Sequence, residues 1–150
     1  MQLYMIDGIS NVLLIFAHKS ATECPKHLYE LMNIEEFRNI CLSFPFAQEN
    51  SPWADHKYDH LVTFTVASKW FCILDIENKF CNIKCDPNQI DTLLEKYNGA
   101  MPAWHMNKRH WIKIVLESDI PDKEIASLIS QAYNLIVNKL PKSTITKMTI

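Results

Sequence analysis

Apolar residues in the first third of the chain follow a helical spacing and then lose it. Between residues 34 and 43 they recur every three or four positions, and Asn33 with Glu36 matches the capping box that opens a helix. Pro45 follows this segment and does not allow the helix to continue. No sustained period is present from residue 46 to residue 60. We therefore predict a helix over 34–43 and a loop over 46–60.

Three predicted strands follow this loop. Residues 61–66 alternate between two kinds of side chain, as in a strand that buries one face. Residues 70–76 are apolar on both faces, which is typical of a central strand. Residues 80–85 alternate again and place Asn82 and Lys84 on the more polar face. Short turns separate the segments, so we expect a three-stranded meander.

The second half of the chain predicts two helices with a strand between them. Asp86 is a good N-cap with Pro87 at the first helical position, and the first helix ends at Gly99. Residues 111–116 alternate as a strand does. Asp119 is the predicted cap of the last helix, whose apolar stripe is about four turns long.

This order of elements, α-β-β-β-α-β-α, predicts an α+β fold: a two-layer sandwich with a largely antiparallel sheet and helices on one face. The domain is expected to span residues 32–142, after an N-terminal extension over 1–31 and before a loosely held tail over 143–150. The other face of the sheet should present hydroxyl, amide, cationic and aromatic groups from Thr63, Thr65, Asn82, Lys84, Trp111 and Lys113.

The N-terminal extension contains one apolar run, residues 12–17, which is far shorter than the roughly 20 residues that span a bilayer. Nothing positive precedes this run and Asp7 is negative, which disfavours a secretory signal. Two interpretations stay open: an added element docked on the domain, or a poorly packed tail, which the helix start after Met32 favours. A mis-set start codon would also account for this extension. In each case we expect a cytoplasmic protein without a membrane segment.

Composition and charge limit the functions that are open to the chain. Its 150 residues are enough for one domain that buries a large core without cross-links. Two glycines are too few for a glycine-rich phosphate loop, so we expect Asn and Asp at turn positions with positive φ. Five scattered cysteines are typical of buried thiols in a reducing compartment. The net charge is −2, so an anionic partner has to meet a local basic patch.

The best candidate for a working surface is the segment 103–111, which gathers two Trp, two His, a Lys and an Arg. Cys81, Cys85, His105 and His110 have a spacing near that of a zinc site. Two cysteines four residues apart in one extended strand, however, are about 13 Å apart, too far to bind one ion. We therefore expect neither a metal nor a cofactor.

Catalytic arrangements have equally weak support in the sequence. No thiol stands at a helix N-terminus beside a cation, where its nucleophilicity would be raised. The acidic residues gather at predicted helix N-termini, where capping explains them. We expect a protein that is not an enzyme.

Two kinds of binding remain, against a purely structural interpretation in which both indoles of the segment fill the core and the basic run is a solvated loop. In a protein-interaction module, Trp70, Trp104 and Trp111 would anchor a partner on the exposed sheet face. In nucleic-acid binding, cations would neutralise phosphates and an exposed indole would stack on an unpaired base. The cations in question are Lys84, Lys108, Arg109 and Lys113.

Three segments of the chain resemble the MmcQ/YjbR family in order and spacing. They are Asn-Ile-Lys-Cys-Asp-Pro from residue 82, Pro-Ala-Trp-His-Met-Asn-Lys-Arg-His-Trp from residue 102, and Ile-Pro-Asp from residue 120 before a helix that ends in Lys-Leu-Pro. The sequence departs from the family at Phe46, which replaces a common Gly, and at Ser118-Asp119, which replaces Asp-Gly. The matching residues are Lys84, His105, Asn107, Lys108, His110 and Trp111.

The resemblance implies a small cytoplasmic bacterial protein with a frataxin-like (CyaY-like) fold, described as a predicted DNA-binding protein with a double-wing arrangement. We therefore expect weak contact with DNA and little preference for sequence. The expected DNA-binding residues are Lys84, His105, Asn107, Lys108, Arg109, His110, Trp111 and Lys113. The oligomeric state stays open.

Overall fold

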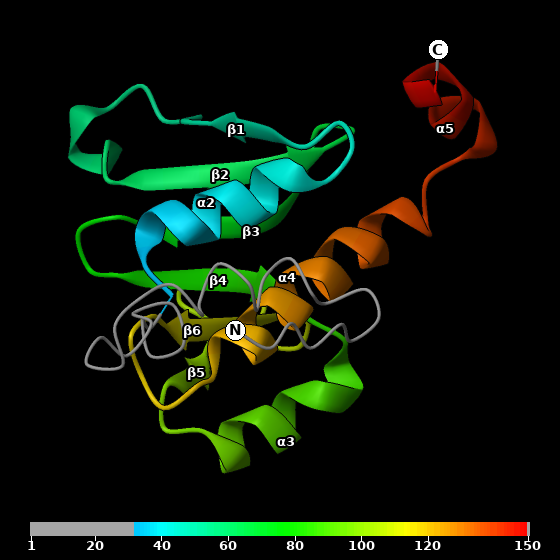
Figure 1. Ribbon diagram of the computed structural model, residues 1–150. Coiled ribbons are helices and arrows are strands. Elements are labelled where there is room, and N and C mark those ends of the chain that lie inside the picture. The colour runs from blue at the N-terminus through cyan, green and yellow to red at the C-terminus, as the bar shows by residue number, and fades with distance from the viewer. Residues whose placement is uncertain (1–31, 150) are drawn as a thin grey trace, which may run out of the picture. The chain divides into compact units, whose positions relative to one another are not determined.

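Six strands form one antiparallel sheet in the computed structural model, which describes residues 32–149 (Figure 1). The predictions for residues 1–31 lie outside these residues. Along the chain the strands are β1 (Gln48–Asn50), β2 (Leu61–Val66), β3 (Lys69–Asp75), β4 (Phe80–Lys84), β5 (Ala100–Pro102) and β6 (Trp111–Val115). Their order in the sheet is β1-β2-β3-β4-β6-β5, and every neighbouring pair is antiparallel.

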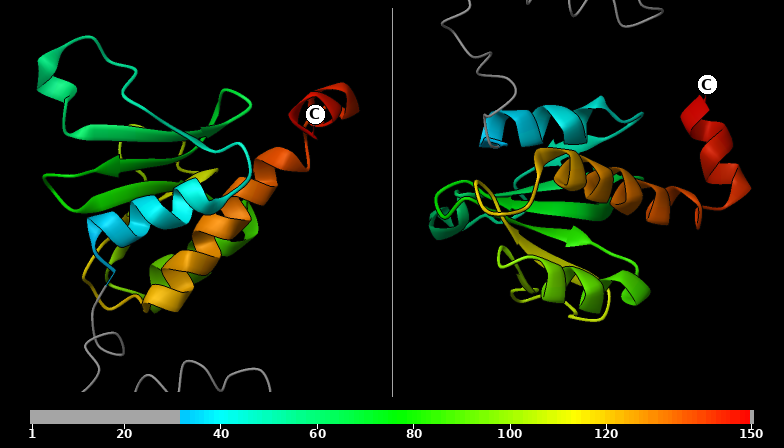
Figure 2. Two further views of the ribbon diagram at one scale, coloured as in Figure 1. Left: turned by 45° about the horizontal axis from the view of Figure 1, so that its top comes forward. Right: turned by 60° about the horizontal axis from the view of Figure 1, so that its bottom comes forward.

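The helices are α2 (Ile34–Ser43), α3 (Pro87–Lys96), α4 (Asp122–Val137) and α5 (Lys142–Thr149), with a 3-10 turn η2 (His56–Tyr58). Helices α2 and α4 lie side by side on one face of the sheet, and α4 crosses β2, β3 and β4 (Figure 2). Helix α3 packs against β5 and β6. The predicted α+β class with an antiparallel sheet is confirmed.

Strand alternation builds the core as the sequence predicts. Phe64 on β2 pairs with Cys72 on β3, which pairs with Ile83 on β4, which pairs with Ile112 on β6. All four side chains have no exposed surface. This row lies under the helices and belongs to a single apolar cluster with them. The neighbouring positions point to the opposite side, which we call the open face. Strand β2 is buried on both faces, not on one as predicted. Thr63, Thr65, Asn82 and Trp111 are at most 7% exposed, so the expectation that the open face presents their groups is wrong.

The caps of α2 and α3 are confirmed. Asn33 Oδ1 accepts a hydrogen bond from the backbone N of Glu36 at 2.9 Å, and Glu36 Oε2 accepts one from the backbone N of Asn33 at 3.1 Å. This reciprocal pair satisfies two of the N–H groups that a helix start leaves without a partner. Asp86 caps α3 through its side chain, which accepts from the backbone N of Asn88.

The predicted cap of α4 is wrong. The N-cap position of this helix is Pro121, which makes no side-chain hydrogen bond. Asp119 instead accepts two hydrogen bonds of 2.7 Å, from the backbone N–H groups of Asn98 and Gly99. A Cβ on Gly99 would lie 2.1 Å from Ser118 Oγ, so glycine is required for this close approach and not, as predicted, for the end of α3.

The expectation that Asn and Asp occupy the turn positions with positive φ is also wrong. Ala67 and Ser68 form a two-residue turn between β2 and β3 with φ of 49° and 62°. Such a turn needs positive φ at both positions to match the twist of the strands. Across residues 32–149 the non-glycine residues with positive φ are Phe46, Ala67, Ser68, Lys79, His105 and Glu117.

Several short elements were not predicted. Strand β1 and the turn η2 lie within residues 46–60, which were predicted as a loop, and β5 lies directly before the segment 103–111. β1 and β5 have three residues each, too few to show a period of two in the sequence. Helix α5 occupies the predicted tail; it buries no residue, although Met148 packs partly against the core.

Candidate functional site

Lys84 and Trp111 are paired residues on the open face, one at the end of β4 and one at the start of β6. The Lys84 ammonium nitrogen lies 5.3 Å from the centroid of the Trp111 ring, within the range of a cation-π contact. Trp111 is only 7% exposed, so its predicted outward position does not leave the indole available for stacking on a base. The indole supports the lysine instead.

Lys84 is one of three lysines that line a concavity of about 540 Å³ at this end of the strands. Lys69 comes from the start of β3, after the turn from β2, and Lys139 follows the C-terminus of α4. We call these three residues the lysine cluster. The concavity is completed by Ser68, Trp70, Trp111, Leu135 and Ile136.

The lysine cluster is electrostatically unfavourable by itself. Partial burial lowers the pKa of Lys84, and the positive charges of Lys139 and Lys69 lower it further. Within residues 32–149, the ion pairs of basic residues with carboxylates involve Arg38, Lys57, Lys79 and two histidines, and none involves the cluster. An anion in the concavity would relieve both the repulsion and the desolvation.

The remaining predicted cations lie elsewhere on the surface. Lys113 is on the open face, but its ammonium lies 4.1 Å from the centroid of the Phe80 ring, toward the opposite end of β4. Lys108 and Arg109 are exposed in the loop between β5 and β6. Asn107 Oδ1 shapes this loop by accepting a hydrogen bond of 2.9 Å from the backbone N of Arg109. The structure therefore brings Lys84 into contact with Trp111, and the concavity that they line includes none of the other three cations.

The two predicted histidines are also separated. His110 is exposed, and its backbone carbonyl accepts a hydrogen bond from the backbone N of Cys85 at 2.9 Å. His105 has φ of 53° and lies with its ring centroid 4.1 Å from that of Trp104. No group of three or more metal-ligating side chains occurs between residues 32 and 149. Burial raises the pKa of the Cys85 thiol to about 11, which opposes formation of a thiolate.

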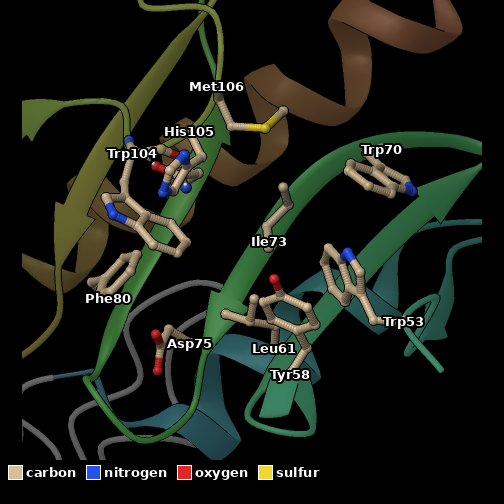
Figure 3. Close-up of a pocket in the computed structure, with 11 residues that line it drawn as sticks. Trp53, Tyr58, Leu61, Trp70, Ile73, Asp75, Phe80, Trp104, His105 and Met106 are labelled. Carbon is tan, nitrogen blue, oxygen red and sulfur yellow. Dashed lines mark hydrogen bonds between the residues drawn. The ribbon is translucent and has the colours of Figure 1, made fainter. Parts of the chain in front are cut away.

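A second pocket, of about 330 Å³, lies on the open face and was not predicted (Figure 3). One wall consists of Trp53, Tyr58 and Trp70, and the opposite wall consists of Phe80, Trp104 and His105. Ile73 and Leu61 form an aliphatic floor between the walls. We call this cavity the aromatic pocket. Trp70 lines both this pocket and the concavity of the lysine cluster.

Two polar side chains of the aromatic pocket have defined partners. Asn82 Oδ1 accepts a hydrogen bond from the backbone N of Trp104 at 3.2 Å, and Asn82 Nδ2 donates one to the carbonyl of Trp104 at 3.1 Å. Asp75 is 2% exposed and accepts hydrogen bonds from the backbone N and the side-chain Nδ2 of Asn78. His60 Nε2 lies 3.8 Å from the Asp75 carboxylate.

Sequence reasoning missed Lys69, Lys139, Trp53 and Tyr58. In the sequence, Lys69 stands in a turn between two predicted strands, and Lys139 begins the Lys-Leu-Pro segment after the last helix. The two residues are far apart in the chain. Their proximity depends on how α4 crosses the sheet, which no local pattern shows. Trp53 and Tyr58 stand in the aperiodic segment before β2, where an aromatic residue is the only signal of packing.

Comparison with known proteins agrees with the fold. The structure is similar to that of the Deinococcus radiodurans protein DR2400, a domain of the family DUF419, with a TM-score of 0.70 and 23% identity over 79% of this chain and 88% of that one. It is also similar to a Pseudomonas syringae protein, with a TM-score of 0.60 and 27% identity over 69% of this chain and 98% of that one. These likenesses define an α+β class with an open antiparallel sheet.

The family model YjbR matches residues 42–135, more than half of the chain, and the chain belongs to the YjbR family. It is 29% identical to the uncharacterised protein YjbR of Escherichia coli K12 over 112 residues, which are 74% of this chain and 92% of that one. It is 33% identical to the uncharacterised protein YyaQ of Bacillus subtilis over 96 residues, or 56% and 80% of the two chains. The family resemblance seen in the sequence is confirmed. None of the helices within residues 32–149 has the length and apolar character that crossing a bilayer requires.

Proposed function

We propose that the protein binds DNA weakly and with little sequence preference, without catalysing a reaction, and that the lysine cluster makes the main phosphate contacts. The observation that supports this best is the concavity in which Lys69, Lys84 and Lys139 come together. Placing three ammonium groups around one hollow raises the free energy of the native state. A phosphate group in the hollow would lower it again, because it supplies the missing negative charge.

The exposed cations of the β5–β6 loop extend this surface. Lys108 and Arg109 are solvent-exposed. Lys113 lies in β6, the strand that follows this loop, and points to the open face. Contacts to phosphate and sugar position a duplex but do not read its sequence. A surface on which phosphate contacts dominate therefore fits binding with little sequence preference.

The role of Trp111 differs from the expectation. Its indole is buried, so we assign it to holding the Lys84 ammonium over its ring rather than to stacking on a base. His105 and Asn107 are assigned to shaping the loop, since His105 has positive φ and Asn107 accepts a backbone hydrogen bond. A frataxin-like arrangement and a cytoplasmic location belong to the same proposal.

The test compares two double charge reversals by fluorescence anisotropy with labelled duplex DNA at low salt. Lys69→Glu with Lys139→Glu should weaken binding by about tenfold or more, because each change replaces an attraction to phosphate with a repulsion. The matched control is Lys96→Glu with Lys123→Glu, which makes the same change in net charge on α3 and at the start of α4. An equal loss in both variants, or no binding by the unmodified protein, contradicts the proposal.

A second candidate function is an interaction with a protein on the open face. The observation in its favour is Trp104, whose side chain is 44% exposed beside a pocket lined by other aromatic residues. Exposed aromatic anchors dominate many protein interfaces. Salt distinguishes the two candidates: binding to phosphates weakens steeply as ionic strength rises, whereas an aromatic-anchored contact changes little.

A further inference from the structure

We propose that the aromatic pocket binds a methylated ammonium group, held between its two aromatic walls and beside the buried carboxylate of Asp75. This site is separate from the phosphate surface proposed above and does not depend on it. Its volume of about 330 Å³ is within the range of pockets that hold small ligands. The proposal rests on the shape of the cavity, on its charge and on the way its walls are fixed.

The walls present aromatic rings from opposite sides of one cavity. In Figure 3 the side chains of Trp53, Tyr58 and Trp70 stand on one side of Ile73, and those of Phe80 and Trp104 stand on the other. Aromatic faces carry partial negative charge and attract cations, most strongly where water is excluded. Cages of this kind are how proteins recognise quaternary ammonium groups.

The charge of the cavity selects a cation. Asp75 is the carboxylate of the lining, and the side chain is 3% exposed. Its hydrogen-bond donors both belong to Asn78 and are neutral, so they do not cancel its charge. His60 lies 3.8 Å away and is positive only when protonated. The lining contains no lysine or arginine, in contrast to the neighbouring concavity. Two lysines outside the lining contact its rings: the Lys113 ammonium lies 4.1 Å from the Phe80 centroid, and the Lys57 ammonium lies 4.9 Å from the Tyr58 centroid. The indole rings of Trp53, Trp70 and Trp104 therefore remain for a ligand.

The apolar character of the cavity selects a methylated group over a bare ammonium. An unmethylated ammonium has three N–H donors and loses free energy if they stay unpaired away from water. Leu61, Ile73 and the indole rings offer no acceptors, and the Asp75 carboxylate already accepts two hydrogen bonds from Asn78, so the lining has few acceptors for three donors at once. Methyl groups need no acceptors and gain from contact with such a lining.

The walls are held in place before any ligand arrives. Asn82 hydrogen-bonds both backbone polar groups of Trp104, which fixes the backbone of this residue beside β4. The ring of Trp53 packs between those of Tyr58 and Trp70, with centroid separations of 5.9 and 5.8 Å. His105 is kept in a left-handed backbone conformation that non-glycine residues adopt at a cost in free energy. Binding to a cavity that is already formed costs less free energy, because fewer side chains have to be ordered.

The decisive comparison uses choline and its neutral carbon analogue 3,3-dimethylbutan-1-ol, titrated into the full chain at constant ionic strength. The readout is the set of indole N–H signals in a nitrogen-proton correlation spectrum. Saturable shifts from choline should appear at Trp53, Trp70 and Trp104 and be smallest at Trp111, which lies outside the aromatic pocket. The neutral analogue should bind at least about tenfold more weakly, because it has the shape without the charge. Equal binding of both compounds, or no saturation up to the solubility limit, overturns the proposal.

Two variants test whether the residues of the aromatic pocket bind choline or only stabilise the fold. Trp104→Leu removes one wall at a residue that is 44% exposed, and Asp75→Asn keeps the size of the group and one of the two oxygens that accept from Asn78. Both should weaken choline binding by about tenfold. The control Met101→Leu changes an exposed side chain on β5 outside the pocket and should leave binding unchanged.

If Asp75→Asn is unstable, Trp104→Leu alone decides the matter: retained choline affinity in that variant contradicts the proposal. A peptide containing trimethyllysine identifies the source of the group. Tighter binding of the peptide than of choline assigns the group to a protein side chain, and equal or weaker binding assigns it to a free small molecule.

Discussion

Lys84 and Trp111 face each other across β4 and β6, with the lysine ammonium 5.3 Å from the centroid of the indole ring. The pairing places a buried aromatic surface under a cation whose other neighbours, Lys69 and Lys139, are also positive. No ion pair within residues 32–149 involves these three lysines.

The burial of Trp111 predicts that its loss harms the fold, unlike the loss of Trp104. Trp111→Ala should lower the free energy of unfolding by about 3 kcal/mol, the lower end of what truncating a buried Trp costs. Trp104→Ala should cost less than about 1 kcal/mol, because this side chain is 44% exposed. Urea denaturation followed by circular dichroism measures both. A loss for Trp111→Ala as small as the one expected for Trp104→Ala would show that Trp111 is not a core residue.

The lowered pKa of Lys84 predicts a rise in stability with alkaline pH. Between the folded pKa and the ordinary value of 10.5, the unfolded chain holds the proton on Lys84 more strongly than the native protein does. Stability therefore increases as pH rises through this window, since unfolding takes up a proton. Denaturation midpoints measured from pH 8 to pH 10.5 should rise for the unmodified protein relative to Lys84→Met. If the midpoints of the unmodified protein and of Lys84→Met change with pH in parallel, the pKa of Lys84 is not lowered in the native protein.

Inorganic phosphate provides a separate check on the same lysine. An anion in the concavity should raise the pKa of Lys84 toward or above its ordinary value, because it favours the charged form. NMR titration of the Lys84 side chain with and without phosphate reports the change. A lysine outside the cluster, such as Lys123, serves as the reference and should not respond.

Asp119 is expected to stabilise the protein at neutral pH and to lose this effect in acid. Its hydrogen bonds from the backbone N–H groups of Asn98 and Gly99 hold its pKa below the ordinary value of 3.8. The contribution is thus fully present above pH 3.8 and is lost as pH falls through the lower folded pKa. Asp119→Ala should reduce the unfolding midpoint at pH 7 and flatten the acid limb of the stability profile. If the acid limb of the profile is unchanged in Asp119→Ala, the loss of stability in acid comes from other groups.

Elements with a clear period and a local cap could be predicted from the sequence. The helix after Asn33 and the alternating strand after His60 are examples, because each is determined by residues close together in the chain. Asp119 misled the prediction because a carboxylate before a helix can cap it or bind another loop, and only the fold decides between these. The lysine cluster and the aromatic pocket consist of residues from different elements. The sequence identified some of these residues as candidates, but it could not predict that they lie close together.

The salt dependence of DNA binding tests the central claim most directly. For the unmodified protein, the logarithm of the association constant should fall linearly with the logarithm of salt concentration, with a slope that reports the number of neutralised phosphates. Replacing Lys69, Lys84 and Lys139 together by glutamine should make this slope shallower by about 2 to 3, close to one for each lost contact on a duplex. A slope that is unchanged by this triple substitution in a folded protein would contradict the account.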